Sequence, residues 1–386
     1  MNKLPEGWEI KKLGEVCKIV YGKGLPVKQL KEDGYPVFGA NGIIGFNDRY
    51  LYEDSEVLIS CRGAYSGKIN LSPPRCYVTN NSLILKISNQ KVLDKKYLFY
   101  ALHTVNKSKL ITGTAQPQVT INNAVELSFP LPPLPVQHAI VTKIEEIFSE
   151  LDHGVEQLKT ARQQLKVYRQ AVLNSVIIGE AEHTIESVIE SLDQGWSPKC
   201  YNEPSRNKDE WAVIKTTAVQ AGYYQEEENK RLPEDLAPRK QHELKKGDLL
   251  ITRAGPRVRV GICCLVKKTR PKLLNCDKVY RMRINPELAI PEYVEMLLNS
   301  PRYSKEIEKM KTGISDSGVN LTQKGFLKIL IPLPSLSEQH RIVSEIERRL
   351  SVCDKLEETI ERSLKAAEVL RAGVLKRAFE GRLVGS

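Results

Sequence analysis

Long hydrophobic runs are absent from this sequence, and residues 1–8 hold no apolar segment of the kind that directs a protein to secretion. We therefore expect a cytoplasmic protein. Cysteine is also scarce: the eight cysteines are scattered and include no CxxC pair. This usage excludes a disulfide framework, argues against a zinc site and predicts reduced thiols in the core.

Catalytic motifs are missing as well. The chain contains no GxxxxGK[ST] phosphate loop, no HExxH zinc pair, no PD-(D/E)xK nuclease cluster and no FxGxG cofactor loop. Ser72-Pro73-Pro74-Arg75 is similar to the [NDS]-PP-[FYW] tetrapeptide of amino-methyltransferases, but Arg75 stands where an aromatic residue would stack on the target base. We therefore expect a chain that has no active site of its own.

Positive charge is abundant. The sequence holds 58 lysines and arginines against 47 aspartates and glutamates, a formal net charge of +11. Such a balance favours an anionic partner, and nucleic acid is the usual one.

The most informative feature is an internal duplication. PLPPLPVQHAIV at residues 130–141 returns as PLPSLSEQHRIV at residues 332–343, an offset of 332 − 130 = 202 residues. Other parts repeat too: 55–63 is echoed by 248–255, 94–102 by 291–298, and 113–119 by 313–319. The β-rich blocks before the two proline-rich runs thus read as diverged copies of one α/β domain.

Each proline-rich run opens a segment in which apolar residues recur at spacings of three and four for about five heptads, which is typical of a coiled coil. In the first copy these residues are Ile140, Ile144, Ile147, Leu151, Leu158, Ala161, Leu165, Tyr168 and Val172. In the second they are Ile342, Ile346, Leu350, Cys353, Leu356, Ile360, Leu364, Ala367, Leu370 and Val374. Helices over 136–177 and 338–379 would match in length and pair antiparallel within one chain; pairing between two chains is the alternative.

The expected fold is α+β: two homologous α/β recognition domains separated by two long helices that form an antiparallel coiled coil, with a pseudo-two-fold internal repeat. The expected division is 1–135 for the first domain, 136–180 for the central helix, 181–337 for the second domain and 338–386 for the C-terminal helix. An antiparallel pair would set the two domains at its opposite ends and act as a ruler between them.

Loops rich in cationic and amide side chains follow the β-rich pieces of both blocks. Arginine and lysine can bind guanine, glutamine can bind adenine, and the remaining cations can hold phosphates. The candidate DNA-binding residues are Lys23, Arg62, Tyr65, Ser66, Lys68, Gln116 and Gln118 in the first block, and Arg253, Arg257, Arg259, Lys311 and Ser315, beside Asp316, in the second. Ordinary polar turns are the alternative for any one of them.

The duplicated PLP-x-L-x-x-QH-x-IV run, each copy followed by a heptad helix, resembles the specificity subunits of type I restriction-modification systems over nearly the whole chain; Val136 in the first copy stands where the second has Glu338. The resemblance implies two target recognition domains that read a bipartite, asymmetric sequence in double-stranded DNA. It implies two methyltransferase subunits, which methylate adenine, and restriction subunits as partners. S-adenosylmethionine, ATP and magnesium would then bind to partner subunits and not to this chain.

The Gln-His pairs that open both helices, Gln137-His138 and Gln339-His340, are candidates for partner contacts, although the histidines could equally pack the helix starts. Two other functions remain open: a standalone DNA methyltransferase or fusion enzyme, and a coiled-coil scaffold with no nucleic-acid role.

Overall fold

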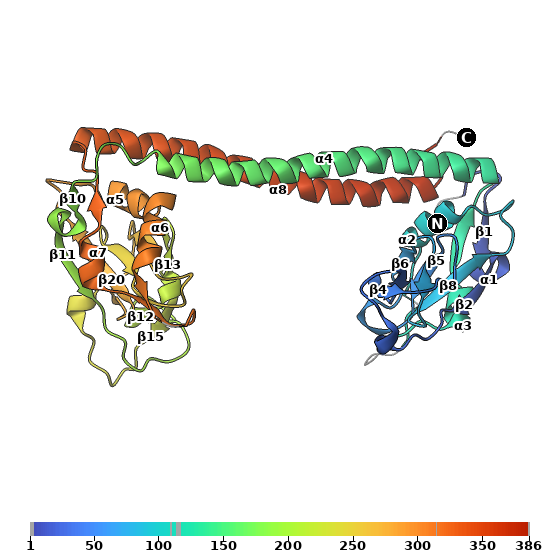
Figure 1. Cartoon of the computed structure of the whole chain (residues 1–386), viewed down its shortest axis with the longest axis horizontal. Helices are drawn as coiled ribbons and strands as arrows, with labels where there is room; N and C mark the ends of the chain where they lie inside the picture. Colours follow the sequence, from blue (N-terminus) through green and yellow to red (C-terminus); the bar gives the residue numbers. More distant parts are fainter. Residues whose placement is uncertain (1–3, 109, 113–116, 314, 385–386) are drawn as a thin grey trace. The chain divides into compact units, whose positions relative to one another are not determined.

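The computed structural model of the chain describes residues 4–108, 110–112, 117–313 and 315–384. The chain forms two compact units: Met1–Lys159 together with Glu361–Ser386, and Thr160–Ile360. Both boundaries fall inside the long helices α4 (Leu134–Asn174) and α8 (Leu336–Phe379), so each unit contains a part of both helices (Figure 1). The four-part division expected from the sequence places its boundaries at the ends of the long helices and not within them. That division stays a prediction.

Within its described residues, the first unit has two sheets and a strand pair. The four-stranded sheet has the order β2 (Cys17–Tyr21), β8 (Ser82–Ile87), β5 (Val57–Ser60), β6 (Ile69–Leu71). The three-stranded sheet has the order β4 (Ile43–Asn47), β3 (Tyr35–Phe38), β7 (Tyr77–Val78). The remaining elements are β1 (Glu9–Lys12) paired with β9 (Ser128–Leu131), and the helices α1 (Leu13–Val16), α2 (Lys95–Thr104) and α3 (Ile121–Val125).

The second unit repeats this plan. Its four-stranded sheet has the order β11 (Ile189–Gln194), β20 (Val279–Ile284), β16 (Leu249–Thr252), β18 (Cys263–Leu265), and its three-stranded sheet β15 (Asn229–Arg231), β12 (Ala212–Ile214), β19 (Leu273–Leu274). The strand pair is β10 (His183–Thr184) with β23 (Leu330–Ile331). Its helices are α5 (Pro291–Leu298), α6 (Pro301–Met310) and α7 (Gln323–Leu327). Additional strands are β13 (Val219–Gln220), β14 (Tyr223–Tyr224), β17 (Ala254–Gly255), β21 (Lys311–Thr312) and β22 (Val319–Leu321).

The layers of both units are built around one central strand, β5 or β16. Successive side chains of a strand point to opposite faces. Val57 and Ile59 of β5 therefore join the core under the helices, whereas Leu58 joins the core under the three-stranded sheet. In the second unit Leu249 and Ile251 face the helices, and Leu250 faces the other way. Burial of each such side chain contributes about 1.5–3 kcal/mol, which explains why both strands read as continuous apolar runs.

The two long helices run antiparallel to each other in both units, within one chain. In the first unit Arg371 of α8 pairs with Asp152 of α4, and in the second Arg169 of α4 pairs with Asp354 of α8. The two ion pairs are related by the duplication, since 371 − 169 = 202 and 354 − 152 = 202. The pseudo-two-fold repeat expected from the sequence is thus confirmed, as are the antiparallel helices and the α+β class.

The structure corrects details of the helix prediction. Both helices begin two residues earlier than expected, and α4 ends at Asn174 rather than at residue 177. In α4 the early start is possible because Pro135 fits a first helical turn. Tyr168, Leu356 and Leu370 were assigned to the apolar seam, but each is about half exposed, at 47%, 49% and 52%.

The cysteines are free thiols, and all except the partly buried Cys200 lie in the core. Within the described residues, no helix has both the length and the apolar character that a membrane crossing needs.

Candidate nucleic-acid interface and helix junctions

In the first unit the structure brings together most of the loop residues expected to contact DNA. Arg62 and Gln118 face each other in an isolated antiparallel bridge, although they are far apart in sequence. The Ser66 hydroxyl donates to the Pro117 carbonyl over 2.7 Å, which ties the turn at 63–66 to the same loop. Arg62 and Gln118 are exposed, so their side chains are available to a ligand.

Tyr65 and Lys68 complete this surface. Tyr65 is 52% exposed, and the Lys68 ammonium lies 5.8 Å from the centre of its ring. Lys23 is exposed on a neighbouring loop, where its backbone N–H donates to the Val78 carbonyl over 2.9 Å. Gln116 lies outside the described residues. The first-unit cluster therefore offers cations for phosphates, an amide for a base edge and an aromatic ring for stacking.

In the second unit the geometry corrects two candidates. The guanidinium of Arg259 donates to Gln220 Oε1 and to the carbonyls of Thr216 and Val219, at 2.6–3.1 Å. The Lys311 side chain is only 7% exposed, and its ammonium donates to the Arg257 carbonyl (2.8 Å) and to Glu308 (2.6 Å). Most donors of both cations are taken up inside the protein, where they hold the loops in place.

Of the other candidates in the second unit, Arg253 and Arg257 are partly exposed and Ser315 is exposed. Arg257 is held between Glu308 (2.8 Å) and Asp316 (2.9 Å), and these hydrogen bonds raise its pKa above the usual value. The Nε of Arg253 donates to the Asp277 carbonyl over 2.7 Å, which fixes this half-buried side chain. Ser315 is exposed and shares a hydrogen bond with Ser317 (3.0 Å).

Arg62 and Arg253 do not occupy equivalent positions. Ala254, not Arg253, pairs with Asn320 of β22, just as Arg62 pairs with Gln118. The cationic side chains of the two units thus occupy different positions in the shared fold, and they also differ in number.

The glutamines that open the long helices have an internal role, which corrects the prediction that they contact a partner. Gln137 is fully buried: it accepts from the Asp94 N–H and donates to the carbonyls of Val92 and Pro132, each at 2.8 Å. Gln339 makes the same three contacts in the second unit: it accepts from the Ile290 N–H (3.0 Å) and donates to the Leu288 (3.0 Å) and Pro334 (2.8 Å) carbonyls.

A buried tyrosine strengthens each junction. Tyr97 donates to the Pro130 carbonyl over 2.7 Å, and Tyr293 donates to the Pro332 carbonyl over 3.1 Å. Together with the glutamines, these bonds fix the direction in which each helix leaves its domain. Sequence reasoning missed the tyrosines, although they sit at matching positions of the repeated segments 94–102 and 291–298.

We expect Gln137→Ala to destabilise the first unit by about 3 kcal/mol, because three buried polar groups would lose their partner. The urea midpoint should fall by roughly 1 M, given a typical dependence of a few kcal/mol per molar urea. Gln164→Ala, at an exposed position of the same helix, is the matched control and should change stability by less than about 0.5 kcal/mol. Equal midpoints for the two variants would contradict the buried role.

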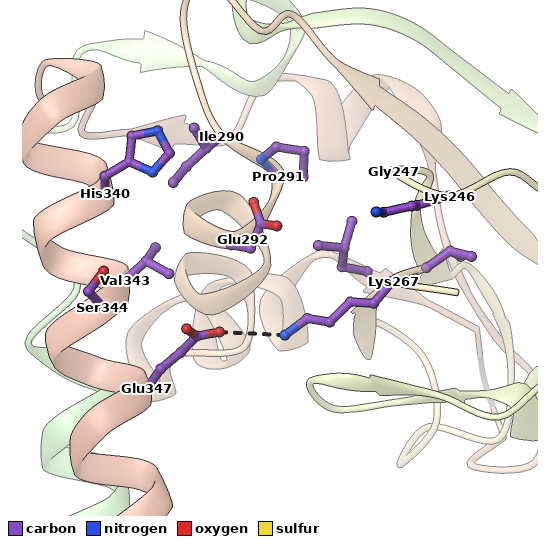
Figure 2. Close-up of a pocket in the computed structure, with 12 residues that line it drawn as sticks. Lys246, Gly247, Lys267, Ile290, Pro291, Glu292, His340, Val343, Ser344 and Glu347 are labelled. Atoms are coloured by element: carbon purple, nitrogen blue, oxygen red, sulfur yellow. Dashed lines mark hydrogen bonds and ion pairs between the residues drawn. The ribbon is translucent and has the colours of Figure 1, made fainter. Parts of the chain in front are cut away.

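The histidines beside these glutamines are exposed. His138 lies 3.8 Å from Asp94, and His340 borders a hollow of about 500 Å³ between α5, α8 and the end of β18 (Figure 2). Across this hollow Lys267 pairs with Glu347 at 3.5 Å, and in the first unit Lys96 pairs with the repeat-related Glu145 at 2.8 Å. The histidines therefore remain open to a partner, whereas the glutamines do not.

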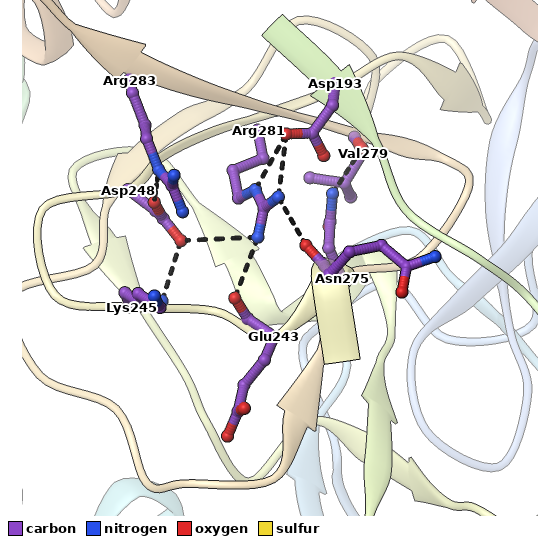
Figure 3. A network of polar contacts seen from close by, with 9 residues as sticks. Asp193, Glu243, Lys245, Asp248, Asn275, Val279, Arg281 and Arg283 are labelled. Atoms are coloured by element: carbon purple, nitrogen blue, oxygen red, sulfur yellow. Dashed lines mark hydrogen bonds and ion pairs between the residues drawn. The ribbon is translucent and has the colours of Figure 1, made fainter. Parts of the chain in front are cut away.

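A buried polar network fixes the turn between β19 and β20 of the second unit (Figure 3). Arg281 is 6% exposed and pairs with Asp193 at 2.8 Å, and its guanidinium also donates to the Gln241 and Glu243 carbonyls at 2.9 Å. The Asn275 amide donates to the Val279 carbonyl over 2.9 Å and closes the turn. Residues 275–279 thus form a hydrogen-bonded turn that leads from β19 of the three-stranded sheet to β20 of the four-stranded sheet.

The one sequence similar to a methyltransferase motif has a structural role. The Ser72 hydroxyl accepts from the Glu56 N–H over 2.9 Å, and Arg75 pairs with Glu53 at 3.0 Å. Ser72 is also buried, so it is not placed to orient a target base. Within the described ranges, no cluster of side chains suits a metal ion.

Comparisons with known proteins agree with this architecture. Residues 5–165 match the family described as the type I restriction modification DNA specificity domain. The type I restriction enzyme EcoEI specificity subunit of Escherichia coli is 42% identical over 177 residues, which span 46% of this chain and 30% of that protein. The EcoKI specificity subunit of Escherichia coli K12 is 26% identical over an alignment that spans 99% of this chain and 90% of that protein.

Solved structures share the fold across the whole chain. One, from a study of complex assembly and conformational transition of the type I R-M system, has a TM-score of 0.75 at 20% identity and covers 99% of this chain and 100% of its own. The HsdS subunit from Thermoanaerobacter tengcongensis has a TM-score of 0.60 at 19% identity and covers 98% of both chains. The duplicated domains, the paired helices and these matches together show that the chain is similar over its whole length to the specificity subunits of type I restriction-modification systems.

Proposed function

We propose that this chain is the DNA reader of a type I restriction-modification enzyme, in which each unit recognises one half of a bipartite, asymmetric site in double-stranded DNA. The observation that carries the proposal is the contrast between the two units. Their sheets and helix junctions repeat closely, whereas their exposed cationic loops differ. Two readers with one scaffold and different loops suit two different half-sequences, not a palindrome.

The proposed chemistry is recognition without catalysis. Phosphate contacts would supply most of the affinity, and the first-unit cluster around Arg62, Tyr65 and Gln118 would supply part of the sequence choice. Methylation of adenine requires the base to leave the stack, a step that partner methyltransferase subunits would carry out with S-adenosylmethionine. ATP and magnesium would serve the restriction subunits, and DNA as the ligand would place the chain in the cytoplasm.

Partner subunits would dock at the helix junctions. The exposed His138 and His340 lie at repeat-related positions there, so two copies of one methyltransferase could bind in the same way. The antiparallel helices would set the spacer between the two half-sites, which makes them a ruler as well as a docking surface.

The proposal is tested with the purified chain and a random-sequence duplex over a salt series. If the chain covers about six phosphates, its affinity should fall roughly 10³-fold between 50 and 200 mM salt. With S-adenosylmethionine added, the chain alone should transfer no methyl group to the duplex. Methyl transfer by the chain alone would identify a standalone enzyme, and the absence of salt-sensitive DNA binding would favour a scaffold.

A further inference from the structure

We propose that a lysine-lined hollow in the second unit binds the sugar-phosphate backbone of DNA, an inference that rests on the proposed function and gives it a specific site. The hollow has a volume of about 480 Å³ and is lined by four lysines from separate stretches of the chain. These are Lys199, Lys215, Lys230 and Lys278.

The fold, rather than the local sequence, gathers these cations. Lys230 lies on β15 and pairs with Val213 of β12, Lys215 follows the end of β12, and Lys278 lies in the turn that leads into β20. Lys199 belongs to the segment after β11. Within the second unit, β12 and β15 lie on the side turned away from α4 and α8 (Figure 1), so a ligand here would not meet the helices.

The charge in the hollow is poorly compensated. Lys215 lies 3.5 Å from Glu228, but Lys199, Lys230 and Lys278 have no ion pair or side-chain hydrogen bond within the described part of the chain. Asp277 is the one acidic residue of the lining, which gives a formal charge of 4 − 1 = +3. Its carboxylate already accepts from the Ser197 hydroxyl. Like charges gathered in one concave site repel each other, and an anionic ligand relieves that repulsion.

The type of cation indicates the part of DNA that is bound. Lysine is a compact, flexible point charge that can hold phosphate oxygens, and the described lining contains no arginine, asparagine or glutamine whose planar group would pair with a base edge through two hydrogen bonds. All the cationic side chains that line the hollow are lysines, and its volume exceeds that of a site for a single ion. Arg253 stands beside it, because its N–H donates to the Lys278 carbonyl over 2.9 Å and its Nε donates to the Asp277 carbonyl. The hollow would hold the backbone while Arg253 faces the bases.

The first unit lacks this feature at the equivalent place. The strand pairings give the equivalent positions of the two units. The pair Phe38–Val78 of the first unit corresponds to Val213–Leu274 of the second. Likewise, Ser60–Ser82 corresponds to Thr252–Val279. These registers put Ala40, Ile43 and Asn81 where the second unit has Lys215, Lys230 and Lys278, respectively. The lysine hollow is therefore specific to the second unit and is not part of the shared scaffold.

The test replaces three lysines in the full chain: Lys199→Gln, Lys230→Gln and Lys278→Gln. Each phosphate contact contributes about 0.9 to the slope of log affinity against log salt, so the slope should fall by about 2.7. At 0.1 M salt the affinity should drop roughly 10²- to 10³-fold, by the same factor for every duplex sequence tested, because phosphate contacts carry no sequence information.

The matched control is Lys246→Gln, Lys305→Gln and Lys309→Gln, which removes the same charge from exposed positions that line other hollows of the second unit. The control should keep the wild-type slope, and thermal melting should show that both triple variants remain folded. If the variant at Lys199, Lys230 and Lys278 is folded and has the same salt slope as the control variant, the hollow is not a DNA site. That result would leave the proposed function standing. A wild-type chain without salt-sensitive duplex binding would instead contradict the proposed function itself.

A final comparison separates DNA from free nucleotides. ATP added in excess at constant ionic strength should not displace the duplex from the wild-type chain. Displacement by ATP from the wild type, but not from the hollow variant, would show a nucleotide site and overturn the assignment to DNA backbone.

Discussion

Lengthening both long helices by one heptad should abolish sequence-specific binding while preserving non-specific binding. The insertion is made after Leu158 in α4 and after Ile360 in α8, two positions related by the repeat offset of 202. Each unit keeps its own helix contacts, because Asp152 and Arg371 lie on one side of the insertions and Arg169 and Asp354 on the other. Seven residues at 1.5 Å each extend the helix pair by about 10 Å and keep the heptad seam in phase.

On B-DNA this extension corresponds to roughly three base pairs and a rotation of about 100° around the duplex, given 10–10.5 base pairs per turn. The translation favours a longer spacer, but the rotation turns one reader away from its groove. Affinity for the original site should therefore fall to the non-specific level, a loss of roughly 10³-fold or more. Binding to random DNA should keep its salt dependence, because phosphate contacts need no register.

The measurement is a titration of the wild-type and lengthened chains, each with its methyltransferase, against duplexes whose spacers differ by single base pairs. Insertion into α4 alone is the control, since it breaks the antiparallel match and should lower the melting temperature. A lengthened chain that keeps both the original spacer and the original affinity would show that the helices dock partners without setting a distance.

Exchange of residues 183–335 for the equivalent block of a related chain should replace one half of the recognised site completely and leave the other half unchanged. The exchange runs from β10 to the residue before α8, so it retains Gln339 and the whole of the second helix. The physical reason is that each unit has a separate hydrophobic core and a separate set of loops. Methylation mapped in a host that carries the exchanged chain gives the new site. A change in both half-sites at once would contradict independent readers.

The scaffold could be predicted from the sequence because apolar spacing and helix starts depend on residues that are close together in the chain. The duplication repeats both of these patterns. The continuous apolar runs of β5 and β16 and the seam positions Ile140 and Ile342 are such features, and all are buried as expected. Tyr168, Leu356 and Leu370 were misassigned because heptad spacing does not reveal where the partner helix leaves a seam position uncovered.

The candidate sites were harder to predict, because they depend on which distant segments meet. Arg259 and Lys311 lie in polar loops like those of true ligand contacts, yet carbonyls and a carboxylate from other segments take up their donors. The lysines at 199 and 278 are 79 residues apart, and only the pairing of the strands brings them to one hollow. Gln137 and Gln339 were found by their repetition, but repetition marks a shared structural bond as readily as a shared partner.

The central claim, that this chain specifies a bipartite site through two different readers, is tested most directly by sequencing the methylated bases in a host that carries the chain and its methyltransferase. The account predicts methylated adenines in two unlike half-sequences separated by an unspecified spacer of fixed length, and none of them when the chain is deleted. A palindromic site, a single continuous site, or methylation that persists without the chain would contradict it.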